Sequence, residues 1–111
     1  MMKQTDINTF RRKYFDLQRK REKNQIVHDT NTTKPHRVLL TDICEWLCEN
    51  KYTFYTRVYT KLGEIVDIVA PELPRPFIEV RHSELDKDKK YCKEYDSLRI
   101  FVDTKDPWGL L

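Results

Sequence analysis

Residues 63–82 read GEIVDIVAPELPRPFIEVRH, and this stretch decides the fold. It holds two short apolar runs rich in Val, Ile and Phe, which are typical of strands. Three prolines within residues 71–76 keep the connection between the runs out of any sheet. One acid stands inside each run, Asp67 in the first and Glu79 in the second. The stretch therefore predicts two paired strands that carry two carboxylates into a sheet.

The patterns on both sides of this stretch predict an α/β domain. Residues 52–60 alternate in β fashion, and residues 35–50 show a helical apolar stripe. After the stretch, Ser83 followed by Asp86 resembles a capping box for a charged helix, and residues 98–102 form a last strand. The order predicts a small mixed four-stranded sheet flanked by helices. Its hairpins should be antiparallel, and its fourth strand should run parallel to its third.

The N-terminal segment is predicted to be a basic helix. Apolar residues recur at helical spacing up to Leu17, which predicts an amphipathic helix over residues 6–27. A polar stretch over residues 28–35 reads as a linker, so the chain divides into a basic helical arm (1–28) and an α/β domain (35–111). The cations on the arm are candidates for nucleic-acid contact: Arg11, Arg12, Lys13, Arg19, Lys20, Arg21 and Lys23.

The charge is distributed unevenly along the 111 residues, although the net charge is only +3. Residues 1–37 carry ten Lys or Arg against four Asp or Glu, a net +6, whereas residues 38–111 carry eleven against fourteen, a net −3. Clustered cations displace counterions from phosphates, so this asymmetry indicates a polyanionic partner such as DNA. A solvated surface helix explains the same pattern equally well.

Composition narrows the class of protein further. No apolar run approaches the roughly 20 residues that cross a bilayer, and the N-terminus lacks the apolar segment of a secretory signal. We therefore expect an intracellular protein without membrane contact. Its compartment should be the cytoplasm or, for a viral chain, the cytoplasm of the host.

The cysteines Cys44, Cys48 and Cys92 have no zinc-ligand spacing. A bridge from either of the first two to Cys92 stays open.

The two acids need compensation for their charge. Strand alternation places Asp67 with Ile65 and Val69 on one face, and Glu79 with Arg81 on one face of the next strand. Two carboxylates about 4 Å apart repel by roughly 4 kcal/mol at an effective dielectric constant near 20. A hard cation such as Mg²⁺ or Mn²⁺ would compensate this repulsion. An ion pair of Asp67 or Glu79 with Arg81 or Arg57 is the alternative, and it needs no metal.

The pattern GEIVDIVAP, a loop and then FIEVRHSE resembles the signature of the PD-(D/E)xK nuclease superfamily. In that signature an apolar strand carries an Asp, and about a dozen residues later a strand reads Glu, apolar residue, Lys. The resemblance covers residues 35–102 and is nearest to the small archaeal Holliday-junction resolvases and archaeal viral nucleases. It implies a restriction-endonuclease-like core and a metal-dependent DNA endonuclease. The structure of the DNA substrate is left open, and branched and single-stranded DNA are both candidates.

The resemblance also implies roles for individual residues. Asp67 and Glu79 match the acids that bind Mg²⁺ or Mn²⁺, and the backbone carbonyl of Val80 matches the usual third ligand. Glu45, with Glu49 second, is the candidate for a further acid from the first core helix, and an ordinary solvated carboxylate is the alternative for both. Small nucleases of this kind often act as homodimers, because two strands need two centres.

Arg81 departs from the family pattern, which has Lys there. Arginine stays protonated at any relevant pH, so it can stabilise charge in the transition state but cannot act as a general base. Two alternatives follow: a working nuclease with Arg81 as charge stabiliser, or a noncatalytic nucleic-acid-binding or assembly protein on a degenerate nuclease scaffold. The exposed aromatic Trp108 is a candidate for a contact between subunits.

Overall fold

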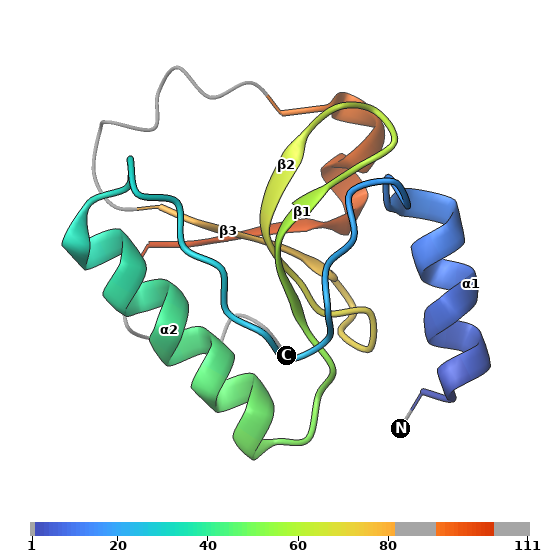
Figure 1. Cartoon of the computed structure of the whole chain (residues 1–111), viewed down its shortest axis with the longest axis horizontal. Coiled ribbons are helices and arrows are strands. Elements are labelled where there is room, and N and C mark those ends of the chain that lie inside the picture. The colour runs from blue at the N-terminus through green and yellow to red at the C-terminus, as the bar shows by residue number, and fades with distance from the viewer. Residues whose placement is uncertain (1, 82–90, 104–111) are drawn as a thin grey trace.

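The computed structural model describes residues 2–81 and 91–103, and within them it confirms an α/β architecture with a four-stranded mixed sheet. Its elements follow one another as shown in Figure 1: α1 (Gln4–Tyr14), α2 (Lys34–Glu49), β1 (Tyr55–Tyr59), β2 (Ile65–Val69), β3 (Phe77–Val80), the 3₁₀ helix η2 (Lys93–Leu98) and β4 (Arg99–Val102).

The strands lie in the order β1-β2-β3-β4. β1 pairs with β2 and β2 with β3 in antiparallel fashion, and β4 runs parallel to β3, as the sequence predicts. Gly63, with φ at +86°, forms the turn between β1 and β2, where a side chain would be strained. Residues 71–76 form the loop between β2 and β3, and the strand pair next to this loop is Val69 with Phe77.

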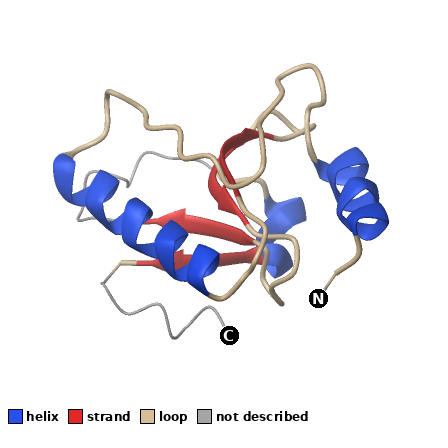
Figure 2. Ribbon diagram, turned by 60° about the horizontal axis from the view of Figure 1, so that its bottom comes forward, coloured by secondary structure: helices blue, strands red, loops and turns tan. Residues whose placement is uncertain are grey.

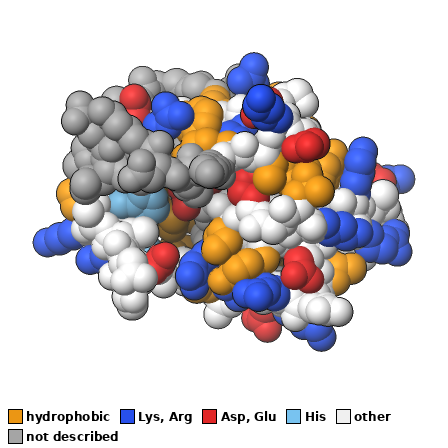
Figure 3. Space-filling view, turned by 90° about the horizontal axis from the view of Figure 1, so that it is seen from above, with side chains coloured by type: hydrophobic (Ala, Val, Ile, Leu, Met, Phe, Trp, Pro, Cys, Tyr) orange, Lys and Arg blue, Asp and Glu red, His pale blue; other side chains and the backbone are white. Residues whose placement is uncertain are grey.

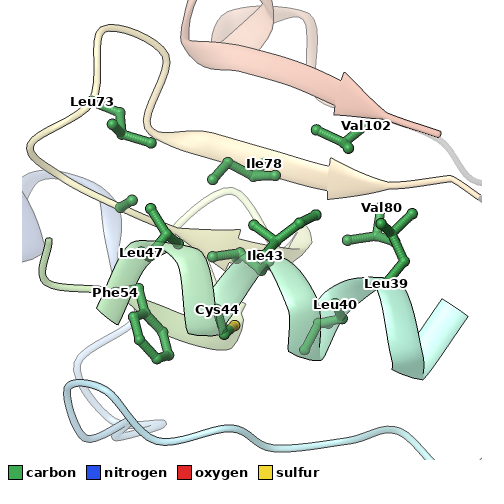
Figure 4. Packing of buried hydrophobic residues seen from close by; sticks show 12 residues of the cluster. Leu39, Leu40, Ile43, Cys44, Leu47, Phe54, Leu73, Ile78, Val80 and Val102 are labelled. Atoms are coloured by element: carbon green, nitrogen blue, oxygen red, sulfur yellow. The ribbon is translucent and has the colours of Figure 1, made fainter. Parts of the chain in front are cut away.

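Helix α2 covers one face of the sheet (Figure 2). The helix begins after Thr33, whose hydroxyl accepts a hydrogen bond from the His36 N–H, and Pro35 stands in its first turn. Its apolar stripe packs on the strands, with Ile43 pointing toward Ile78 (Figure 4). Burial of this stripe is the main source of stability for this layer.

An aromatic cluster fills the other side of the sheet. Phe77 of β3 is fully buried, and the rings of Tyr14 and Tyr95 meet it edge-on at 5.6 Å and 5.0 Å between centroids. Ile7 and Phe15 are buried in the same cluster, so α1 and the residue after it pack on the body of the protein. Edge-on contacts are a preferred geometry for aromatic pairs.

The first helix is shorter than predicted, because it ends at Tyr14 rather than near Val27. Residues 15–27 instead follow the outer edge of β1. The Asp16 N–H donates to the Tyr59 carbonyl at 2.8 Å, and the Asn24 N–H donates to the Phe54 carbonyl at 2.7 Å. The reason is that the apolar stripe stops at Leu17, so a longer helix would bury little, whereas the edge strand offers unpaired backbone groups.

Strand alternation also fails at one point. Val66 and Val69 of β2 both pack in the aromatic cluster, while Ile68 packs against α2. In β1, Tyr55 and Val58 likewise share the aromatic cluster. The exchange of faces occurs at Arg57, whose φ of +48° lies in the left-handed region and interrupts the extended backbone. Strict alternation, which placed Asp67 and Val69 on one face, was therefore wrong: Val69 packs in the aromatic cluster, whereas Asp67 lies beside His36 of α2.

The remaining predictions concern single residues and membrane contact. Ser83, Asp86 and Trp108 lie outside the described residues. The three cysteines are free thiols, and burial, assisted by the charge of Glu45, raises the pKa of Cys44 to about 12. No helix within residues 2–81 and 91–103 is long and apolar enough to cross a membrane.

Replacing Phe77 with Ala should lower the free energy of unfolding by about 3–5 kcal/mol, because it empties the centre of the aromatic cluster. Phe101→Ala is the matched control, since Phe101 of β4 is 38% exposed and should cost much less. Urea unfolding followed by circular dichroism measures both losses. Equal losses would contradict this description of the core.

Candidate functional site

Asp67 and Glu79 lie opposite each other where the ladder between β2 and β3 stops. The last paired residues are Ile68 and Ile78, and beyond them each acid binds the backbone of the other strand. The Asp67 N–H donates to Glu79 Oε1 at 2.9 Å, and the Val80 N–H donates to Asp67 Oδ2 at 2.9 Å. The two carboxylates thus replace the carbonyl oxygens that a regular sheet would supply.

Glu79 is fully buried and its charge is balanced by an arginine. Arg99, at the start of β4, donates from Nη1 to Glu79 Oε2 at 3.1 Å and from Nη2 to Glu64 Oε2 at 2.9 Å. Burial alone would lower the pKa of Arg99, but the hydrogen bond and charge of Glu64, together with the charge of Glu79, raise it above its ordinary value. Arg99 is therefore a permanent cation between two buried acids.

Asp67 faces a cavity of about 230 Å³ between the start of α2 and the sheet. Its side chain is 18% exposed, and Oδ2 lies 3.6 Å from Nε2 of His36, which is itself mostly buried. Arg57, Asp29 and Tyr91 also line this cavity. Asp67 is thus the acid of the pair that lines the cavity, whereas Glu79 is oriented toward Arg99.

The other predicted site residues occupy different positions. Val80 lines the cavity, and its N–H, not the carbonyl that the resemblance names as a ligand, is the group with a hydrogen bond to Asp67. Glu45 is exposed on α2 and is absent from the residues that line the cavity. The guanidinium of Arg81 lies 3.7 Å from the centre of the Phe101 ring and is exposed at the end of β3.

The predicted nucleic-acid contacts divide into two groups. Arg11 lies over the Tyr55 ring at 5.3 Å, so it contributes to packing as well as charge. The guanidinium groups of Arg19 and Arg21 lie over the Tyr59 ring, at 4.4 Å and 5.7 Å from its centre. The remaining cations of the segment are exposed: Arg12, Lys13, Lys20 and Lys23. Figure 3 shows Lys and Arg side chains gathering over the side of the molecule where α1 lies.

Sequence reasoning missed the residues that surround the acids. His36, Glu64 and Arg99 contact the pair or its charge network, yet none was predicted as a site residue. A charged residue inside an apolar strand run, as Arg99 is in LRIFV, was the available signal, because a buried cation requires a buried acid.

The donors for a metal are few among the described residues. Within residues 2–81 and 91–103, no group of three or more His, Cys, Asp and Glu side chains is arranged to hold a metal ion.

Comparison with protein-family models, curated proteins and solved structures found no match to the chain. The site must therefore be interpreted from its own geometry.

Replacing Arg99 with Met should lower the free energy of unfolding by about 3–5 kcal/mol at neutral pH, because Glu64 and Glu79 would be buried without a cation. The loss should shrink as the pH falls, since uncompensated carboxylates take up protons and the protonated form tolerates burial. Urea unfolding at several pH values measures this change.

Arg12→Met is the matched control, because Arg12 is exposed on α1 and its loss should change stability by about 0.5 kcal/mol or less. A pH-independent loss for Arg99→Met, or one no larger than that of the control, would contradict the charge balance described for Glu79.

Proposed function

We propose that the protein is a metal-dependent DNA endonuclease of the PD-(D/E)xK type, with a restriction-endonuclease-like core. One observation carries the proposal: Asp67 and Glu79 meet at the gap between β2 and β3, where each carboxylate binds the backbone of the other strand, and Asp67 lines a cavity. The strand order and directions, with β4 parallel to β3, agree with the order that the resemblance implies.

The oxygen donors at the gap suit a hard divalent cation. Asp67 lines the cavity, Glu79 is the neighbouring carboxylate, and the backbone carbonyl of Val80 is the further ligand that the resemblance implies. Because Arg99 already holds Glu79, binding through both acids requires that carboxylate to exchange Arg99 for the metal. When bound, Mg²⁺ or Mn²⁺ would polarise the scissile phosphate and stabilise the charge that develops on it.

The side chains around the acids complete the proposed chemistry. Arg81, whose guanidinium lies over the Phe101 ring and outside the cavity lining, would have to turn toward the phosphate to stabilise its negative charge, and an arginine there cannot act as a general base. His36, rather than Glu45, is the residue of α2 that faces Asp67, and its Nε2 is placed to hold or move a proton beside that carboxylate. Arg19, Lys20 and Arg21 lie near β1, where they can contact backbone phosphates.

Asp67→Asn should reduce Mn²⁺-dependent cleavage of DNA at least roughly 100-fold, because it removes a charged ligand and leaves a side chain of nearly the same shape. The amide oxygen can still accept from the Val80 N–H, so the fold should be retained. Gel assays on single-stranded, duplex and branched DNA, with and without chelator, measure the activity.

Asp42→Asn is the control for this substitution, since Asp42 is an exposed aspartate on α2 that does not line the cavity. The Asp42→Asn protein should cleave DNA at the wild-type rate. Wild-type cleavage by a folded Asp67→Asn protein would show that the proposed site is wrong.

A specific observation favours a second candidate, a noncatalytic nucleic-acid-binding protein on the same scaffold. Arg99 lies between Glu64 and Glu79 and supplies the compensating charge that a metal would otherwise supply. In this case Mn²⁺ should leave the melting temperature unchanged, whereas a metal that binds the folded state raises it.

Replacing both Arg19 and Lys20 with Gln should weaken binding of DNA and lower the salt dependence of the affinity, because phosphate contacts release counterions. Each lost contact should reduce the slope of log K against log salt by about 0.7–0.9. Lys3→Gln with Lys51→Gln removes the same total charge from exposed positions and is the control. Fluorescence anisotropy at several salt concentrations measures the DNA affinity of both double variants. Equal losses of affinity would contradict a preferred path of the nucleic acid along β1.

A further inference from the structure

Arg57 lies in the same cavity as Asp67, on the strand next to it. The pairs Thr56 with Ile68 and Val58 with Val66 place Arg57 opposite Asp67 in the register of β1 and β2. The Arg57 side chain lines the cavity and is 33% exposed, so it is accessible to a ligand. The cavity therefore holds a permanent cation as well as an acid.

The backbone of Arg57 is strained. Its φ of +48° is unfavourable for a residue with a side chain, at a cost of about 1–2 kcal/mol, and Gly or Asn adopt it more easily. Neighbouring contacts hold this conformation: Arg21 Nε donates to the Arg57 carbonyl at 3.1 Å, and Thr56 Oγ1 donates to the Gln25 carbonyl at 2.9 Å. Strain that the surrounding structure maintains is frequent at functional sites.

The charge of Arg57 is weakly compensated. Its Nη2 lies 3.7 Å from Asp29 Oδ2, well beyond the roughly 2.7–2.9 Å of a charge-assisted hydrogen bond. A guanidinium offers several N–H donors in a planar fork that matches phosphate oxygens. Arg21 contacts both the Arg57 carbonyl and the Tyr59 ring, so the basic segment along β1 leads to this position.

We propose that Arg57 binds a phosphate group of a nucleic-acid strand inside the cavity, across from Asp67. The inference rests on the proposed function for the identity of the ligand, because a nucleic acid is the phosphate-bearing partner considered there. In this arrangement Asp29 competes with the phosphate for the guanidinium, and the distorted backbone of β1 directs Arg57 into the cavity. Arg57 is thus a binding residue that positions a phosphate beside Asp67.

The test compares Arg57→Asn with Lys51→Asn in the full chain. Lys51 is an exposed cation whose φ of +62° is also left-handed, and it does not line the cavity, so both variants lose one charge and place Asn in the same kind of backbone. A labelled single-stranded oligonucleotide with chelator present reports binding without cleavage. Arg57→Asn should weaken the affinity roughly tenfold and reduce the salt slope by about 0.7, whereas Lys51→Asn should change neither.

Two further variants test the site while a positive charge stays at position 57. Asp29→Asn keeps an oxygen for the Asn31 N–H but loses the competing charge, so the affinity should rise. Arg57→Lys should bind more weakly than wild type, whereas Lys51→Arg should bind as wild type does, because only position 57 needs the fork. Thermal unfolding checks that Arg57→Asn is folded, and relief of strain should keep its melting temperature at or above that of wild type.

The outcomes separate this inference from the nuclease proposal. Equal affinities for the Arg57 and Lys51 variants, or unchanged binding by Asp29→Asn and Arg57→Lys, would overturn the phosphate site even where Asp67 proves essential for cleavage. Weaker binding by Arg57→Asn together with an absence of cleavage by wild type would support the phosphate site while removing the nuclease activity.

Discussion

The reciprocal hydrogen bonds between Asp67 and Glu79 are the constraint on which the site depends. Two backbone N–H groups that β2 and β3 would otherwise pair with carbonyl oxygens are bound by carboxylates. Buried N–H groups need an acceptor, so these bonds hold each carboxylate against the backbone of the neighbouring strand at the end of the ladder. The same point of the sheet faces Arg57, where the backbone leaves the extended region. The cavity lies where these two irregularities meet.

Charge then decides what this arrangement can do. Glu64 and Glu79 are buried with one cation between them, and Arg99 cannot lose its proton under ordinary conditions. Removing Arg99 from Glu79 costs the favourable interaction of a buried pair, so a competing metal must supply at least as much. The proposed nuclease and the alternative noncatalytic binding protein would therefore use the same residues. They differ in whether Arg99 or a metal ion compensates Glu79.

Sequence patterns predicted the sheet more completely than the site. Prolines and the glycine turn bounded the strands to within a few residues, and the order of helices and strands gave the directions of pairing. Arg99 and Glu79 are 20 positions apart in the sequence and lie on different strands. No local sequence pattern predicts that their side chains meet. The left-handed backbone of Arg57 carries no compositional signal, because Gly or Asn would be expected there. The end of α1 depended on tertiary contacts along β1 rather than on propensity.

The path of residues 15–27 along β1 has a consequence for handling the protein. An uncovered outermost strand is a template for strand addition by another chain, and such pairing leads to aggregation. The basic segment shields this template through the contacts of Asp16 and Asn24, and Phe15 anchors it in the interior. A shortened chain that lacks the segment should therefore self-associate, and a failure of that chain to bind DNA would not test the proposed DNA binding. Point substitutions of exposed cations are the sound way to separate solubility from recognition.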